Sequence, residues 1–301
     1  MKTGAFTGFD LTIREKGIAW FQFNTPERLN GMTTAIKRDL IEAVTQAQMD
    51  NKVRVLVFTG TGRGFCAGDD LKAYKSAELG GTPLVDPIPP GHDNPIGTYD
   101  GLRTISQHLN TTIRNIDKLT ICAINGVAIQ TGFSLALSCD FRIASEAARM
   151  GSATLRFGLL PDEGGQYLLV RLLGVAKAME FMMRKKIVTA QEALDLGLVS
   201  QVTTSERLEE EAMSLALELA NGPQVSMRLL KKSIYNAAEL SWEHALDEIA
   251  AKTAISDHHN DAKEGVAAFH EKQLLQPHPA RTHTPSPEER TNQPIIEYET
   301  S

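Results

Sequence analysis

Two glycine-rich turns and one pair of acidic residues are the parts of this sequence that could do chemistry. The turns follow short apolar runs typical of buried strands, at 55–68 and again at 120–132. Glycine lets the main chain bend sharply and approach a ligand, and two such turns side by side can aim two main-chain N–H groups at one oxygen. The acidic residues, Asp162 and Glu163, directly follow Pro161. We therefore expect a site that stabilises negative charge on a carbonyl oxygen, with a carboxylate acting as a base.

Three segments around these residues form motifs: Phe65-Cys66-Ala67-Gly68-Asp69-Asp70-Leu71; Asn125-Gly126-Val127-Ala128 with Cys139-Asp140-Phe141-Arg142-Ile143-Ala144; and Leu159-Leu160-Pro161-Asp162-Glu163-Gly164-Gly165. In this order they resemble the motifs of the crotonase (enoyl-CoA hydratase/isomerase) superfamily, and the resemblance extends from about Phe9 to Lys272. It implies an α/β fold with a crotonase-like ββα spiral core, a helical C-terminal trimerisation region, and chemistry on a CoA thioester.

The pattern of apolar residues divides the chain into three regions. Strand and helix patterns alternate through a core at 1–203, and almost only helical patterns follow in a region at 204–275. Within the core we expect strands at 11–13, 18–23 and 53–58, an amphipathic helix from Thr33 or Thr34 to Gln48, and a helix at 99–116. The Pro- and Gly-rich stretch 75–98 predicts a long loop that could serve as a lid. The tail at 276–301, rich in Pro, Thr and Glu, predicts disorder.

Composition is that of an ordinary enzyme and argues against some partners. The chain of 301 residues is 42% hydrophobic and 23% charged, and its net charge of -6 argues against nucleic-acid binding. No apolar run predicts a membrane span or a signal segment, and Cys66, Cys122 and Cys139 are typical of reduced, buried thiols. We therefore expect a cytoplasmic protein with no membrane or nucleic-acid partner.

The resemblance assigns the oxyanion hole to the main-chain N–H groups of Asp69 and Thr131. It also shows what this chain lacks. The two glutamates of enoyl-CoA hydratases correspond to Ser134 and Thr154. Adding water to a double bond needs one group to activate the water and another to deliver a proton, and hydroxyl groups titrate far above neutral pH. A conventional two-glutamate hydratase mechanism is therefore not expected.

Asp162 and Glu163 are the remaining candidates for acid–base chemistry. Some enoyl-CoA isomerases of the family carry one carboxylate directly after the corresponding proline, and related hydrolases carry theirs one residue later. We predict a double-bond isomerase with Asp162 as principal base and Glu163 as secondary residue. An apolar site near Phe133, Phe157, Leu159 and Leu160 would raise the carboxylate pKa. Alternatives are an atypical hydratase, a C–C bond hydrolase, a non-catalytic CoA-ester-binding or scaffold protein, or an acidic pair that merely caps the helix after it.

The remaining site residues are assigned by the resemblance alone. It implies an acyl-CoA substrate with no further cofactor and no metal, and a homotrimer or hexamer in which the C-terminal helix contributes to a neighbouring subunit's CoA site. The expected pocket residues are Ser134, Thr154 and Phe133. The expected CoA contacts are Arg28, Ala67, Lys72, Phe269 and Lys272.

Overall fold

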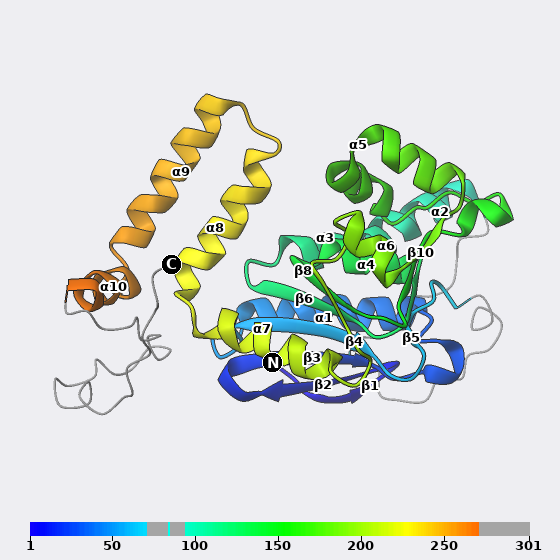
Figure 1. Cartoon of the computed structure of the whole chain (residues 1–301), viewed down its shortest axis with the longest axis horizontal. Helices are drawn as coiled ribbons and strands as arrows, with labels where there is room; N and C mark the ends of the chain where they lie inside the picture. The colour runs from blue at the N-terminus through cyan, green and yellow to red at the C-terminus, as the bar shows by residue number, and fades with distance from the viewer. Residues whose placement is uncertain (71–83, 85–93, 271–301) are drawn as a thin grey trace. The chain divides into compact units, whose positions relative to one another are not determined.

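The computed structural model describes residues 1–70, 84 and 94–270. The chain forms two units, Met1–Leu217 and Glu218–Ser301, which are described separately below (Figure 1). The first unit holds both glycine-rich turns and the acidic pair. Lys72, Lys272 and most of the predicted lid at 75–98 lie outside the described residues.

The larger sheet of the first unit has seven strands in the order β1-β2-β3-β4-β6-β8-β11. Its first three strands pair in antiparallel fashion, and the pairs from β3 to β11 are parallel. The strands predicted at 11–13 and 18–23 are β2 and β3, which pair as an antiparallel hairpin. The bounds are β1 Gly4–Phe6, β2 Phe9–Arg14, β3 Ile18–Phe23, β4 Val55–Gly60, β6 Leu119–Ile124, β8 Phe141–Ser145 and β11 Gln201–Thr203.

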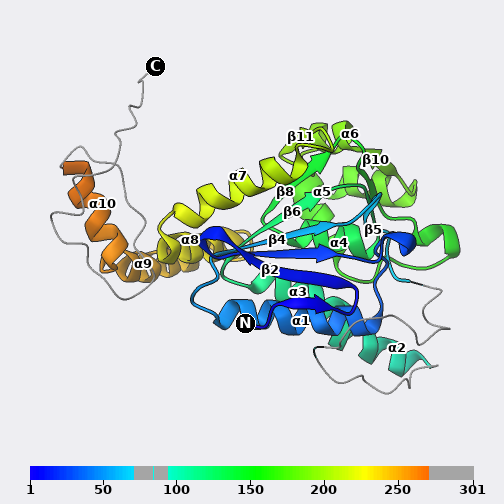
Figure 2. The ribbon, with the colours of Figure 1, turned by 90° about the horizontal axis from the view of Figure 1, so that it is seen from below.

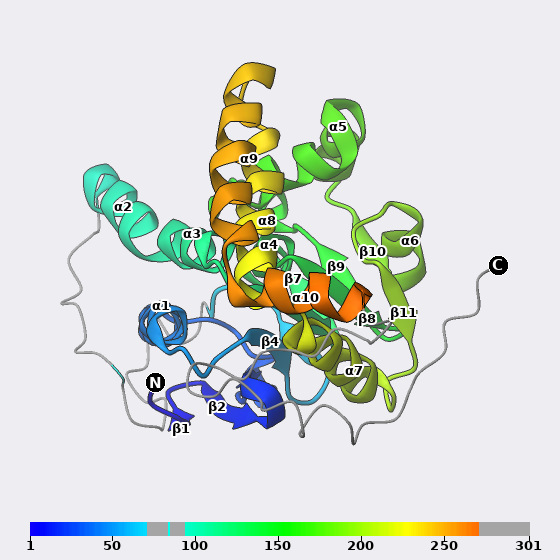
Figure 3. The ribbon, with the colours of Figure 1, turned by 90° about the vertical axis from the view of Figure 1, so that its left-hand side faces the viewer.

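The smaller sheet contains β5 (Gly64–Cys66), β7 (Val127–Ile129), β9 (Arg149–Gly151) and β10 (Ile187–Thr189), in the order β10-β9-β7-β5. Figure 3 shows β7, β9 and β10 following one another beside the large sheet. Each of β4, β6 and β8 is followed by its partner in the small sheet, β5, β7 and β9 in turn. This alternation gives the repeated β-β units of the expected spiral core.

Buried apolar residues fill the space between the large sheet and the helices against it. Strand β4 is buried along its whole length, as expected for a strand covered on both faces. Helices α1 (Thr34–Met49) and α3 (Gln107–Asn115) lie along one side of the sheet (Figure 2). The predicted start of α1 is confirmed, because the Thr33 side chain accepts a hydrogen bond from the Ile36 N–H at 3.2 Å.

The helix after the predicted loop begins earlier than expected. Helix α2 covers Pro95–Gly101, although its first residues fall in the stretch expected to be irregular. The Asn94 side chain caps it by accepting from the Gly97 N–H, and proline suits the first helical turn because its missing N–H would have no partner there. A π-helical stretch, Leu102–Ser106, joins α2 to α3.

Two asparagines hold the turn that connects β4 to β5. Asn30 accepts from the Thr25 N–H at 2.9 Å and donates to the Gly64 carbonyl at 2.7 Å. Asn125 accepts from the Gly60 N–H at 3.0 Å and donates to the same Gly64 carbonyl at 3.0 Å. The turn that leads into the first glycine-rich motif is therefore fixed from both sides.

Among the described residues, the remaining helices include four that begin in the region 204–275, where helical patterns predominate. The remaining helices are α4 Thr131–Ser138, α5 Gly165–Met183, α6 Ala190–Asp195, α7 Leu208–Asn221, α8 Gln224–Ala237, α9 Trp242–Asp257 and α10 Asn260–His270. Helix α5 is interrupted at Gly174, whose φ is 75°, and α7 crosses the boundary between the units. Within the second unit α8 and α9 form a hairpin, joined by a 2.6 Å hydrogen bond between Ser226 and Ser256.

Candidate active site

The two glycine-rich turns are in direct contact at the ends of β5 and β7. Gly68 has a φ of 107°, and a Cβ there would lie 3.5 Å from the Gln130 Cβ. A Cβ on Gly132 would lie 2.1 Å from the Cys66 carbonyl oxygen, so only glycine fits. The two turns, distant in sequence, are thus packed backbone against backbone.

This contact places Asp69 beside Thr131. The Thr131 hydroxyl donates to Asp69 Oδ1 at 2.8 Å. Within the described part of the chain, neither the Asp69 nor the Thr131 main-chain N–H donates a hydrogen bond to a protein acceptor. Gln130, which precedes Thr131, has a φ of 48°, a strained value for a residue other than glycine. Such strain is common at functional sites, and the free donors suit an oxyanion hole.

The two acidic residues have different surroundings. Asp162 is half-buried, and its main-chain carbonyl accepts from the Gln107 amide at 2.9 Å. Glu163 is only 2% exposed, and its carbonyl accepts from the Asn110 amide at 3.1 Å. Helix α5 has Gly164 as its N-cap with no side-chain hydrogen bond. The acidic pair therefore does not cap that helix, and Asp162 is the more accessible carboxylate.

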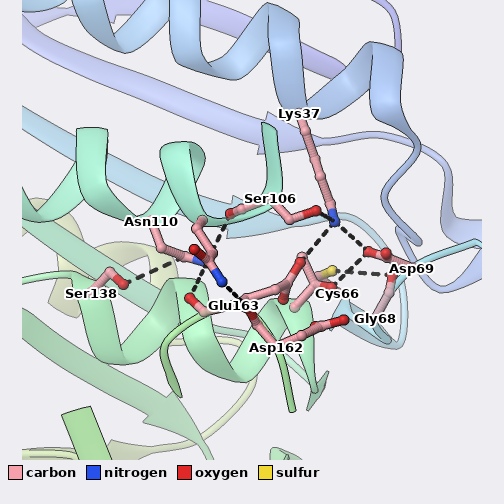
Figure 4. Close-up of polar contacts among 11 residues, drawn as sticks. Lys37, Cys66, Gly68, Asp69, Ser106, Asn110, Ser138, Asp162 and Glu163 are labelled. Carbon is pink, nitrogen blue, oxygen red and sulfur yellow. Dashed lines mark hydrogen bonds and ion pairs between the residues drawn. The ribbon is translucent and has the colours of Figure 1, made fainter. Parts of the chain in front are cut away.

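A buried lysine, not anticipated from the sequence, joins the acidic segment to the first turn (Figure 4). Lys37 Nζ lies 2.7 Å from Asp69 Oδ1 and 2.7 Å from Glu163 Oε1, and its side chain is 3% exposed. The same ammonium group donates to Ser106 Oγ at 2.8 Å. The only sequence signal is a lysine next to the apolar face of a predicted amphipathic helix, which usually means a solvent-exposed charge.

Burial and neighbouring charges shift the pKa values of these groups. Burial raises the pKa of Glu163 to about 7, because desolvation outweighs the lowering by Lys37. The pKa of Asp162 is also raised, mainly by burial, with Asp69 adding to the shift and Lys37 opposing it. Burial alone would lower the pKa of Lys37, but the charges of Glu163 and Asp69 raise it above its ordinary value. Burial raises the pKa of the Cys66 thiol to about 12, so no reactive thiolate forms there.

The positions of the two missing glutamates are occupied by hydroxyl groups in different surroundings. Ser134 is buried, and its Oγ lies against Gly165, where a Cβ would come within 2.4 Å of it. Thr154 belongs to a polar cluster around Gln130. Thr154 and Ser152 each lie within hydrogen-bond distance of Gln130 Oε1, at 3.4 and 2.7 Å. The Gln130 side chain also lowers the pKa of Asp162, against the larger rise caused by burial. Gln130 thus lies near the Ser152 and Thr154 hydroxyls and near the Asp162 carboxylate.

The expected apolar surroundings are only partly present. Phe133 is buried and stacks on Phe181 at 5.7 Å between ring centroids. Phe157, Leu159 and Leu160 are instead exposed, at 72%, 56% and 73%. The predicted apolar enclosure by those three side chains is therefore wrong, although burial still raises the pKa values of the acidic pair.

Of the predicted CoA contacts, two lie close to the first turn. Arg28 forms a 2.6 Å ion pair with Asp70, and the Ala67 N–H donates to the Leu29 carbonyl at 3.0 Å. Phe269 belongs to the second unit and is 81% exposed. The structure thus gathers Arg28 and Ala67 beside Asp69, whereas the CoA roles of all these residues stay predictions.

A pocket of about 650 Å³ in the first unit is lined by Trp20, Thr59, Arg63 and Glu209 among others. None of the predicted site residues lines it. Within residues 1–70, 84 and 94–270, no group of His, Cys, Asp and Glu side chains could hold a metal ion. None of the helices in these ranges has the length and apolar character needed to span a membrane.

Comparisons with known proteins agree with this geometry. The family model for enoyl-CoA hydratase/isomerase matches residues 13–83 and 91–278. The chain is 35% identical to the 1,2-epoxyphenylacetyl-CoA isomerase of Escherichia coli K12, over 87% of this chain and 95% of that protein.

Solved structures give the same assignment. An enoyl-CoA hydratase from Bacillus anthracis superposes with a TM-score of 0.80 at 28% identity, covering 89% of this chain and 98% of that one. An enoyl-CoA hydratase/isomerase from Cupriavidus metallidurans CH34 gives 0.80 at 26% identity, with 93% and 99% covered. The chain belongs to the enoyl-CoA hydratase/isomerase family of the crotonase superfamily, and is an acyl-CoA enzyme of the crotonase fold.

Proposed function

We propose that this protein is an enoyl-CoA double-bond isomerase in which Asp162 is the acid–base residue. The observation that carries the proposal is the difference between the two adjacent carboxylates. Glu163 is enclosed and paired with Lys37, while Asp162 is half-buried and has a raised pKa. A single accessible carboxylate suits a reaction that removes one proton and returns it elsewhere on the same substrate.

In the proposed reaction the thioester oxygen accepts hydrogen bonds from the main-chain N–H groups of Asp69 and Thr131. The Asp162 carboxylate takes a proton from the α carbon, which produces a dienolate, and then returns that proton to the γ carbon. The two N–H groups stabilise the negative charge on the oxygen throughout. The reaction needs no second acid and no further cofactor, which agrees with hydroxyls at 134 and 154.

Two further observations support isomerisation over hydration. The hydratase glutamates are replaced by Ser134 and Thr154, and neither hydroxyl can act as a base unaided at neutral pH. The Escherichia coli relative is also named as an isomerase. We propose Arg28, Ala67 and Lys72 as CoA contacts in the same subunit, with Phe269 and Lys272 contributing to a neighbouring one.

The test measures exchange of α protons for deuterium in a panel of acyl-CoA esters, together with isomerisation and hydration of enoyl-CoA esters. Asp162→Asn should lower exchange and isomerisation by roughly 10²–10⁴-fold, the usual contribution of a positioned general base, with little change in KM. Because the pKa of Asp162 is raised, the acid limb of kcat/KM should lie above the ordinary range of an aspartate.

Two matched variants decide between the alternatives. Glu163→Gln should cost less activity than Asp162→Asn, and the double variant Ser134→Ala with Thr154→Ala should keep exchange. A larger loss in Glu163→Gln would move the base to Glu163 and favour a hydrolase. Efficient hydration that survives Asp162→Asn would refute the isomerase mechanism, and wild-type protein inactive on the whole panel would favour a binding role.

A further inference from the structure

The buried ammonium group of Lys37 joins three separate segments of the first unit. Its partners are Asp69 after β5, Ser106 in the π-helical stretch, and Glu163 before α5, at 2.7, 2.8 and 2.7 Å (Figure 4). A lysine that is 3% exposed has lost nearly all its hydration, so these contacts must compensate a large desolvation cost. Such a group is poorly suited to a surface or solubility role.

Each partner of Lys37 is next to a group that the proposed reaction uses. Asp69 supplies one of the proposed oxyanion N–H groups, and Glu163 directly follows Asp162. Ser106 precedes Gln107, whose amide donates to the Asp162 carbonyl at 2.9 Å. The lysine therefore ties the donor side of the site to the base side.

We propose that Lys37 is a positioning residue, whose ammonium group fixes the spacing between the Asp69 N–H and the Asp162 carboxylate and offsets the negative charge around that carboxylate. This inference rests on the proposed function. It adds a contact and an electrostatic role for a residue on α1, a helix that supplies none of the proposed catalytic groups.

The charges around Asp162 give the expected direction. The groups that face the network are Asp69 after β5, Lys37 from α1 and Glu163 before α5, with the neutral Cys66 thiol from β5. Among the described residues, the other elements contribute hydroxyls and amides, and the next charges along the turn, Asp70 and Arg28, are paired with each other. Within the described part of the chain, Lys37 is thus the cation that counters Asp69 near Asp162.

Two substitutions break the same contact between Lys37 and Glu163, but only one of them removes a positive charge. Lys37→Met removes that charge, which should raise the acid limb of kcat/KM by about one pH unit, the scale of a nearby opposite charge. Glu163→Gln adds no negative charge, so the limb should not rise. Lys37→Met should also lower kcat roughly tenfold or more through displaced groups, with KM nearly unchanged. Lys37→Arg should retain most of the activity.

Controls separate these effects from the loss of a buried lysine. Lys118 is equally buried and donates to the Ala47 and Asp50 carbonyls, outside the site. Lys118→Met should lower stability without moving the acid limb. If Lys37→Met does not fold, the double variant Lys37→Met with Glu163→Gln leaves no unpaired buried carboxylate, and its acid limb should lie above that of Glu163→Gln.

The outcomes that overturn the inference are distinct from failure of the proposed function. Lys37→Met with a wild-type pH profile and kcat within about twofold would refute it, as would equal upward shifts in Lys37→Met and Glu163→Gln. Either result refutes the inference only if Asp162→Asn is inactive in the same assays, which shows that the proposed function holds. Full activity in Asp162→Asn would instead refute the proposed function.

Discussion

Glu163 should make the stability of the protein depend on pH in an unusual direction. Its pKa rises from an ordinary value of 4.5 to about 7 in the folded protein because it is buried. A carboxyl with a raised folded pKa stabilises the fold below its unfolded pKa, and that stabilisation is lost as pH rises through the folded value. The interval is about 2.5 pH units, and at ~1.4 kcal/mol per unit the loss is about 3 kcal/mol between pH 4.5 and 7.

The perturbation that isolates this loss is Glu163→Gln, which stays neutral at every pH. Relative to wild type, the variant should therefore gain about 3 kcal/mol of unfolding free energy as pH rises from about 4.5 to 8. Other titrating groups are common to both proteins and largely cancel in the difference. Lys37 remains in both proteins, so the change with pH reports the ionisation of Glu163.

Urea titrations followed by tryptophan fluorescence can measure this difference. Trp20 belongs to the first unit and Trp242 to the second, so a Trp242→Phe background makes the signal specific for the unit that holds Glu163. Protein concentration is held constant because any oligomer would add a mass-action contribution. A difference that does not change with pH would refute the raised pKa. A variant that becomes less stable relative to wild type as pH rises would show that the Lys37 ion pair outweighs burial.

A matched control tests the sign of the linkage. Hydrogen bonds from the Thr189 backbone and hydroxyl lower the pKa of Glu192 in its capping box. Glu192→Gln should therefore show the opposite trend, because the stabilisation of wild type by this carboxylate is present at neutral pH and is lost on acidification.

Two further predictions concern the turns and the assembly. Gly132→Ala should abolish activity, because the new Cβ would lie 2.1 Å from the Cys66 carbonyl oxygen. Gly101→Ala is the control and should leave activity intact, because no atom lies within 4 Å of its Cβ position. Equal kinetics for both variants would contradict the contact between the turns. We also expect a trimer or hexamer, because the second unit exposes large apolar side chains. Ile234, Trp242, Val266 and Phe269 are 61%, 72%, 59% and 81% exposed. Analytical sedimentation tests this, and a stable monomer at micromolar concentration would contradict it.

Much of the fold could be predicted because local signals and the global pattern agree. The apolar run that became β4 and the Thr33 cap of α1 each have a local cause that the sequence shows. Local signals also explain why the prediction of an irregular segment at Asn94-Pro95 is wrong. Both residues are typical of irregular segments and also of helix starts, and only the structure shows which applies to α2.

The electrostatic network of the site could not be predicted in the same way. Lys37 lies 126 residues from Glu163 in sequence, and nothing near it indicates an ion pair. The different environments of Asp162 and Glu163 could not be predicted either. They depend on contacts among α1, α3 and the π-helical stretch, which are far apart in sequence from the acidic pair. The glycines of the two turns suggest that the turns lie side by side, but the close contact between Gly132 and the Cys66 carbonyl is seen only in the structure.

The asparagines that hold the β4–β5 turn also bear on the chemical durability of the protein. Asn30 and Asn125 are each followed by glycine, the pairing in which the next main-chain nitrogen most easily attacks the side-chain amide and converts asparagine to aspartate. Hydrogen bonds hold both side-chain amides in place. The attacking nitrogen after Asn30 is also engaged, because the Gly31 N–H donates to the Arg28 carbonyl. The folded state thus protects both amides from this attack. A chain that has deamidated while unfolded would bring a carboxylate against the Gly64 carbonyl, and could no longer set the turn that leads to Asp69.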